Sequence, residues 1–121
     1  MIITLNDASD VPVYLQIRNQ IVIGISDGRL KPGEKLPTVR ALAEEIGINS
    51  MTVNKAYQLL KQEGYILTDR RNGARVRENF GGIAGLSEES GELLKKIASE
   101  AKISGMSQKE FISICEQYFG E

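Results

Sequence analysis

Two short amphipathic segments on either side of a glycine-containing turn constrain the fold of this chain more than any other feature. Thr38 can cap a helix over residues 39–46, and Gly47 suits the left-handed conformation that commonly ends a helix. Asn49 can cap a second helix that ends near Gly64. The inner face of this second helix is formed by apolar residues, namely Val53, Ala56, Tyr57 and Leu60. Two helices joined by a turn of about three residues predict a helix-turn-helix.

The periodicity of the apolar residues changes from helical to strand-like directly after the second helix. Residues 65–68 and 74–77 have the composition of strands. Asn72 and Gly73 between them predict a two-residue hairpin turn, because both residue types accept positive φ. A hairpin in this position is the wing of a winged helix-turn-helix.

The remaining segments complete a mainly α fold with one small β hairpin. Residues 2–5 predict a short strand, and residues 12–26 have the apolar spacing of a helix. We therefore expect a winged helix-turn-helix N-terminal domain over residues 1–78 and a glycine-rich hinge over 79–85. Residues 86–121 then form a short two-helix C-terminal dimerisation module.

The two helices of the C-terminal module have apolar faces that they cannot cover by themselves. Ser87 can cap the first helix, and Ser107 with Glu110 forms a capping box for the second. We expect a second copy of the chain to cover these faces, as a homodimer. The predicted dimerisation residues are Leu86, Leu93, Leu94, Ile97, Ala101, Phe111, Ile114, Cys115, Tyr118 and Phe119. Cys115 is expected to be a small buried hydrophobe within this pattern.

The outer face of the helix-turn-helix and the wing present side chains suited to DNA. Short donors and acceptors with a few cations are the groups that contact base edges and phosphates in a major groove. The candidate DNA-binding residues of the helices are Thr38, Arg40, Asn49, Ser50, Met51, Thr52, Asn54 and Lys55. Those of the wing are Arg70, Arg71, Asn72, Gly73 and Arg75.

Arg40 and the arginines of the wing favour an external anion, although each has a second interpretation. Arg40 lies in the first turn of its helix, where a cation opposes the helix dipole. Its guanidinium could therefore bind a phosphate or a guanine. An ion pair with Glu44 is the alternative. The wing cluster, to which Arg77 also belongs, could contact phosphates or the minor groove, or could be a solvated hairpin.

Several separate motifs resemble the DNA-binding domain of GntR-family bacterial transcription regulators. They are VPVYLQI at 11–17, GRLKPGEKLP at 28–37, RALA at 40–43, GI at 47–48, TV at 52–53 and EGYI at 63–66. The resemblance implies that Arg40 contacts DNA and that residues 49–54 read operator bases. Many members have other residues at the positions of Asn54 and Arg71. The base preference and the wing contacts of those members therefore cannot be assumed for this chain.

The short C-terminal part resembles the YtrA subfamily of these regulators, which has a small helical dimerisation module. The resemblance implies a repressor, often one of its own operon with transporter genes. A module of about 40 residues leaves little room for a ligand pocket of the usual few hundred cubic ångströms. We therefore expect no dedicated small-molecule effector site within one chain, and any such ligand would bind at the dimer interface or near the hinge.

Composition excludes several other functions. The chain has no histidine, which excludes Ser-His-Asp and Cys-His catalysis and His-ligated metal sites. A single cysteine cannot form an internal disulfide. The acidic pairs Glu44-Glu45 and Glu88-Glu89 consist of adjacent helical residues, which do not face each other. We therefore expect no enzyme, no cofactor and no metal.

The charge of the whole chain conceals two unlike parts. The net charge of its 121 residues is −1. Residues 1–80 have 11 basic and 9 acidic side chains, whereas residues 81–121 have 4 and 7. The basic excess therefore lies in the predicted DNA-binding domain.

The expected partners are double-stranded operator DNA and a second copy of the chain, with no membrane. The apolar runs are far shorter than the roughly 18 residues of a membrane span, and the N-terminus lacks a secretory pattern. We expect a cytoplasmic bacterial protein that is associated with the nucleoid when bound. The alternative function is a winged-helix protein-interaction module that does not bind DNA.

Overall fold

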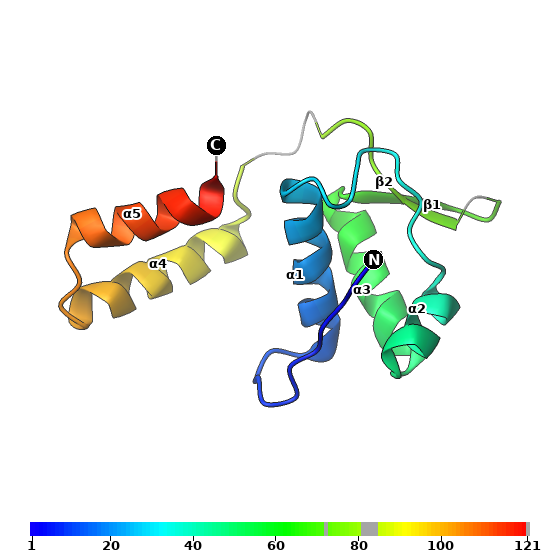
Figure 1. The fold of residues 1–121 in the computed structure, drawn as a ribbon, viewed down its shortest axis with the longest axis horizontal. Coiled ribbons are helices and arrows are strands. Elements are labelled where there is room, and N and C mark those ends of the chain that lie inside the picture. Colours follow the sequence, from blue (N-terminus) through cyan, green and yellow to red (C-terminus); the bar gives the residue numbers. More distant parts are fainter. Residues whose placement is uncertain (72, 81–84, 121) are drawn as a thin grey trace. The chain divides into compact units, whose positions relative to one another are not determined.

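The computed structural model describes residues 1–71, 73–80 and 85–120 and divides the chain into two compact units, Met1–Ile83 and Ala84–Glu121 (Figure 1). The elements of the first unit are α1 (Val13–Ser26), α2 (Val39–Ile46), α3 (Ser50–Glu63), β1 (Ile66–Asp69) and β2 (Gly73–Val76). Those of the second are α4 (Glu88–Ile103) and α5 (Gln108–Phe119). The predicted mainly α fold with one hairpin is confirmed. Most of the predicted hinge lies outside the described residues.

The helix-turn-helix begins and ends at the residues that the sequence predicts. The Oγ1 atom of Thr38 accepts a hydrogen bond from the Ala41 N–H at 3.0 Å, and the Oδ1 atom of Asn49 accepts one from the Met51 N–H at 2.7 Å. Gly47 follows α2 with a φ of 71°, and Gly64 follows α3 with a φ of 90°. Both glycines adopt the left-handed conformation, which a side chain would disfavour.

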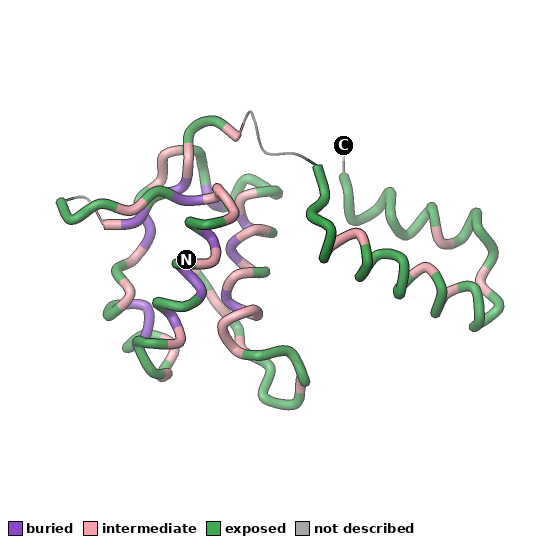
Figure 2. The backbone as a smooth tube through the Cα atoms, turned by 180° about the vertical axis from the view of Figure 1, so that it is seen from behind, coloured by how far each residue is buried: buried purple, intermediate pink, exposed green. Residues whose placement is uncertain are grey.

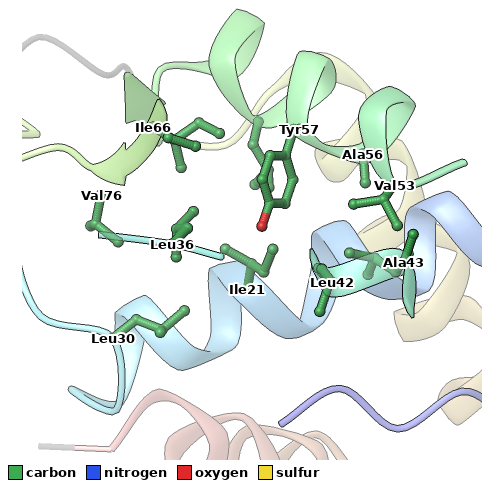
Figure 3. Close-up of a cluster of buried hydrophobic side chains, with 13 residues drawn as sticks. Ile21, Leu30, Leu36, Leu42, Ala43, Val53, Ala56, Tyr57, Ile66 and Val76 are labelled. Atoms are coloured by element: carbon green, nitrogen blue, oxygen red, sulfur yellow. The ribbon is translucent and has the colours of Figure 1, made fainter. Parts of the chain in front are cut away.

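One hydrophobic core joins the three helices and the hairpin of the first unit (Figure 3). Its fully buried large side chains are Ile17, Ile21, Leu42, Leu60, Ile66, Val53 and Val76. The Tyr57 hydroxyl donates a hydrogen bond to the Pro37 carbonyl at 2.7 Å and so holds α3 to the segment before α2. Burial, and to a smaller extent the Glu45 carboxylate, raises the pKa of Tyr57.

The turn of the hairpin differs from the predicted two-residue turn at Asn72 and Gly73. Asp69 pairs with Gly73, so residues 70–72 connect the strands and Gly73 is the first residue of β2, with a φ of 70°. The Asp69 carboxylate accepts the Arg71 N–H at 2.8 Å and so stabilises the start of the turn directly after β1. Asn72 itself lies outside the described residues.

The far edge of β2 pairs with the segment that precedes α2. The Gly33 N–H donates to the Val76 carbonyl at 3.0 Å, and the Val76 N–H donates to the Glu34 carbonyl at 2.9 Å. The Leu36 N–H donates to the Ala74 carbonyl at 2.8 Å. The wing is thereby held to the approach of the helix-turn-helix as well as to the end of α3.

The predicted strand at residues 2–5 is wrong, because side chains of α1 take the place of a strand partner. The Thr4 N–H donates to Oε1 of Gln20 at 2.9 Å, and Nε2 of Gln20 donates to the Thr4 carbonyl at 2.6 Å. Gln16 binds Asn6 in the same two-way manner, at 2.8 and 3.1 Å. Two side-chain amides one helical turn apart thus hold the N-terminal segment along α1.

The second unit is a helical hairpin in which most of the large apolar residues are exposed (Figure 2). Ser87 caps α4, and Ser107 with Glu110 forms the predicted capping box of α5. No residue of α4 or α5 is buried within the described part of this unit. Cys115 is exposed too, so its predicted burial is wrong for the single chain.

Candidate nucleic-acid interface

The outer face of α3 presents mostly polar side chains to solvent. Met51, Asn54 and Gln58 are exposed and share one face, since they are spaced by three and four residues. Ser50 precedes them and is also exposed, whereas Thr52 is half-buried. This face offers two side-chain amides, which can bind adenine bidentately, beside one apolar side chain.

Lys55 lies at the edge of this face that is next to α1. Its Nζ atom is 4.1 Å from the centroid of the Tyr14 ring. A cation at this distance over an aromatic face is attracted to it, so the pair ties α3 to the first turn of α1. The sequence pointed to Lys55 as a DNA contact but contained no sign of this second role.

A hollow of about 210 Å³ brings the start of α2, the outer face of α3 and the wing together. From α2 and its cap it is lined by Thr38 and Val39, and from α3 by Asn54 and Gln58. From the wing it is lined by Thr68, Asp69 and Gly73. One predicted DNA-binding residue from each of the three elements therefore borders this concave surface, namely Thr38, Asn54 and Gly73.

Arg40 forms the ion pair with Glu44 that the sequence offers as an alternative, but this pair leaves the Arg40 side chain exposed. Its Nε atom is 3.5 Å from Oε1 of Glu44, and the two side chains are 89% and 73% exposed. An exposed pair of this spacing contributes about 0.3–0.5 kcal/mol. The guanidinium therefore remains accessible to an anion at the start of α2.

The wing arginines divide into three exposed residues and one structural residue. Arg70, Arg71 and Arg75 are exposed, whereas Arg77 is half-buried and donates from Nη1 to the Gly64 carbonyl at 3.3 Å. The backbone of Lys35 forms an antiparallel β-bridge with Arg75 at the edge of β2, and Lys35 is also exposed. Lys35 was not predicted from the sequence, because its place beside the wing depends on a pairing between segments 40 residues apart.

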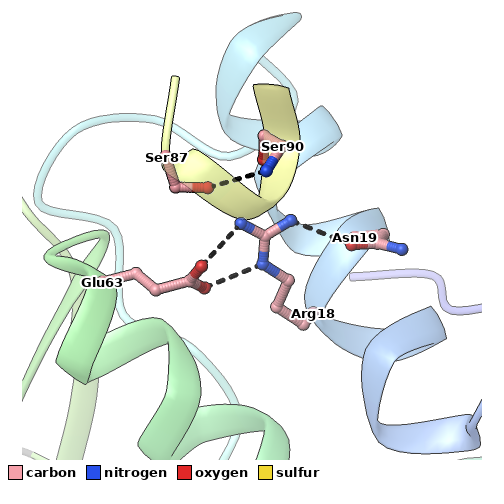
Figure 4. A network of polar contacts seen from close by, with 5 residues as sticks. All are labelled: Arg18, Asn19, Glu63, Ser87 and Ser90. Carbon is pink, nitrogen blue, oxygen red and sulfur yellow. Dashed lines mark hydrogen bonds and ion pairs between the residues drawn. The ribbon is translucent and has the colours of Figure 1, made fainter. Parts of the chain in front are cut away.

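A bidentate ion pair fixes the far end of α3 relative to α1 (Figure 4). Nε and Nη2 of Arg18 donate to the two carboxylate oxygens of Glu63 at 2.8 and 2.9 Å. Nη1 donates to the Asn19 side chain at 2.9 Å, and the guanidinium lies 5.7 Å from the Tyr65 ring centroid. The hydrogen bonds to Glu63 raise the pKa of Arg18. This cluster positions α3 and the start of the wing together.

The described ranges contain neither a metal-ligand cluster nor a membrane-spanning helix. No group of three or more His, Cys, Asp or Glu side chains there could hold a metal ion. None of the described helices combines the length and the apolar character needed to cross a bilayer.

A family model described as "Bacterial regulatory proteins, gntR family" matches residues 13–76. The chain belongs to the GntR family. The matched range covers α1 to β2 and therefore every element that borders the hollow. The relatives of this GntR-family chain are transcription regulators rather than enzymes by their names.

One curated relative of the chain is the HTH-type transcriptional repressor YtrA of Bacillus subtilis. The two are 44% identical over 77 residues, which are 64% of this chain and 59% of YtrA. The match thus spans less than two thirds of that relative. A solved structure described as YtrA from Sulfolobus acidocaldarius, a GntR-family transcription factor, is 37% identical with a TM-score of 0.59 and covers 95% of this chain and 94% of its own. The similarity to the YtrA branch predicted from the sequence is confirmed.

Two further solved structures bear on the fold and on the interface. A transcriptional antiterminator from Listeria monocytogenes has a TM-score of 0.87 at 27% identity and covers all of this chain and 95% of its own. AraR(DBD) in complex with operator ORR3 has a TM-score of 0.53 at 27% identity, over 60% of this chain and 88% of its own. A domain similar in fold to the first unit is therefore known bound to an operator.

Proposed function

We propose that the chain is a sequence-specific DNA-binding transcription regulator that acts as a homodimeric repressor at an inverted-repeat operator. The observation that carries the proposal is the concave surface where the exposed face of α3, the start of α2 and the wing meet, with Arg40 and the wing arginines exposed. The AraR(DBD) complex with operator ORR3 supports it, because its domain has a similar fold.

In this proposal α3 enters the major groove and the neighbouring elements contact the backbone. The base-reading residues are Asn49, Ser50, Met51, Thr52 and Asn54, from the first turns of the helix, as is usual for a recognition helix. Thr38, Arg40 and Lys55 contact phosphates on either side of the groove. The wing residues Arg70, Arg71, Asn72, Gly73 and Arg75 contact phosphates or the adjacent minor groove.

The second unit joins two reading units into a dimer. Its exposed apolar residues support this role: Leu93 is 56% exposed, Tyr118 86% and Phe119 89%. The proposed interface consists of Leu86, Leu93, Leu94, Ile97, Ala101, Phe111, Ile114, Cys115, Tyr118 and Phe119. Two copies related by a twofold axis would read an inverted repeat with half-sites spaced by about one helical turn or a small multiple.

The name of the YtrA relative supports repression. Repression would follow from occlusion of a promoter. The proposed target is the operon of the regulator itself with transporter genes. The proposal includes a cytoplasmic location, association with the nucleoid when bound, no enzymatic activity and no dedicated effector site.

Substitution of single arginines tests the proposal. The full chain is used to enrich a duplex from a random library, and binding is measured by fluorescence anisotropy for Arg40→Ala, Arg71→Ala and the control Arg29→Ala. The Arg29→Ala substitution removes the same charge from the same unit. Arg29 lies away from the proposed interface, where its Nε atom is 2.9 Å from the Asp27 carboxylate. We expect the first two variants to bind at least tenfold more weakly and the control to bind normally.

The salt dependence of binding separates phosphate contact from a general loss of charge. The affinity falls as salt rises, so log K against log salt has a negative slope. Removing one phosphate contact per protomer should make this slope shallower by about 1.8 for the dimer. Equal affinities for all three variants would contradict DNA binding through this surface. Failure to enrich any duplex would favour the protein-interaction module instead.

A further inference from the structure

The first turn of α3 exposes one large apolar side chain where the other exposed residues are polar. The side chain of Met51 is 76% exposed, and it is the only exposed large hydrophobic residue of α3, a helix that the structure describes completely. The other exposed residues on the outer face include Ser50, Asn54 and Gln58, which are polar. Met51 therefore makes no contribution to the core, and the face that presents it is the proposed base-reading face.

The backbone around Met51 is fixed before any partner arrives. Its N–H donates to Oδ1 of Asn49 at 2.7 Å, and the Thr52 N–H donates to the Asn49 carbonyl at 3.1 Å. Val53, two residues on, is fully buried in the core. The α-carbon of Met51 is thus held in place, while its unbranched side chain can adapt to a neighbouring surface.

The major groove contains only one apolar group for such a side chain to contact. Adenine, guanine and cytosine present donors and acceptors there, whereas thymine adds its 5-methyl group. We propose that Met51 determines specificity for a thymine in each operator half-site by contact with the thymine 5-methyl group. The inference rests on the proposed DNA binding and specifies which chemical group this residue reads.

The expected effect is small but measurable. Removing one methyl group from water stabilises a complex by ~0.8 kcal/mol, which corresponds to a change in affinity of about fourfold per half-site. A hydrogen-bonded base contact would not depend on this methyl group. Replacing thymine by uracil therefore isolates the proposed contact, because uracil keeps every donor and acceptor of thymine and lacks only the methyl group.

The test uses the full chain and a duplex that the wild-type protein enriches from a random library. Each thymine of the duplex is replaced by deoxyuridine in turn, and the dissociation constants are compared for wild type, Met51→Ala, Met51→Leu and the control Ile23→Ala. Ile23 is a 55% exposed hydrophobic residue of α1, outside the proposed interface. Alanine is a good helix former and Met51 is exposed, so Met51→Ala should keep the fold.

We expect one thymine in each half-site at which uracil weakens wild-type binding about fourfold. The difference should disappear in Met51→Ala and persist in Met51→Leu and Ile23→Ala. If no thymine is sensitive, or if the sensitive thymine stays equally sensitive in Met51→Ala, the inference is wrong while the proposed DNA binding stands. Failure to enrich any duplex would overturn both.

Discussion

The ion pair of Arg18 and Glu63 gives a quantitative test of how α1 and α3 are held together. The pair has two hydrogen bonds of 2.8 and 2.9 Å, and the side chains are only 20% and 29% exposed. Exposed pairs contribute about 0–1 kcal/mol, whereas removing one partner of a fully buried pair costs about 3–5 kcal/mol. Partial burial and bidentate geometry place the coupling energy of this pair at about 1–2 kcal/mol.

A double-mutant cycle measures that coupling energy. Arg18→Met, Glu63→Gln and the double variant are unfolded with urea at one protein concentration, and unfolding is followed by circular dichroism. The exposed pair of Arg29 and Asp27, treated in the same way, serves as the control and should show a clearly smaller coupling. A coupling for Arg18 and Glu63 within about 0.3 kcal/mol of zero would refute the role of this cluster in positioning α3.

Three further tests by substitution address the helix ends, the core and the dimer. Gly47→Ala should lower the free energy of unfolding by about 1 kcal/mol, because Gly47 has a φ of +71°. Gly91→Ala should raise the free energy of unfolding by about 0.5–1 kcal/mol, because Gly91 lies inside α4. Urea denaturation measures both changes. Tyr57→Phe should destabilise by about 1 kcal/mol in the same assay, because it removes the hydrogen bond to a carbonyl. Ile97→Glu should sediment as a monomer, whereas Ile103→Glu, a substitution at the exposed end of α4, should remain a dimer.

The helix-turn-helix could be predicted almost residue by residue because its ends depend on local chemistry. Thr38 and Asn49 cap helices through their own side chains, and Gly47 and Gly64 end them through their own φ angles. These effects act within four residues along the chain, so the sequence contains them directly. The apolar spacing of α3 then predicts which face is buried.

Features that depend on distant segments could not be predicted from the sequence. Residues 2–5 have the composition of a strand, but their hydrogen-bond partners are the side chains of Gln16 and Gln20 rather than another backbone. The bridge between Lys35 and Arg75 likewise joins segments that are far apart in the chain. A pattern of residue types does not specify such partners.

The candidate site was predictable by residue type and less so by the role of each cation. The sequence grouped Arg77 with the wing arginines, yet Arg77 bonds to the Gly64 carbonyl, whereas Arg75 is exposed. Lys55 lies over Tyr14 and so belongs partly to the packing of α1. Alternation along β2 separates Arg75 from its buried neighbours, but Arg77 lies just beyond the strand, where that pattern ends.

Selection of DNA from a random library by the full chain is the direct test of whether two copies of the chain read an operator together. We expect an enriched inverted repeat whose half-site centres are separated by about 10–11 base pairs or a small multiple, with the affinity falling steeply as salt rises. Enrichment of no common sequence, or of a single unrepeated half-site bound by one chain, would contradict the claim that α3 reads DNA in a dimer held by α4 and α5.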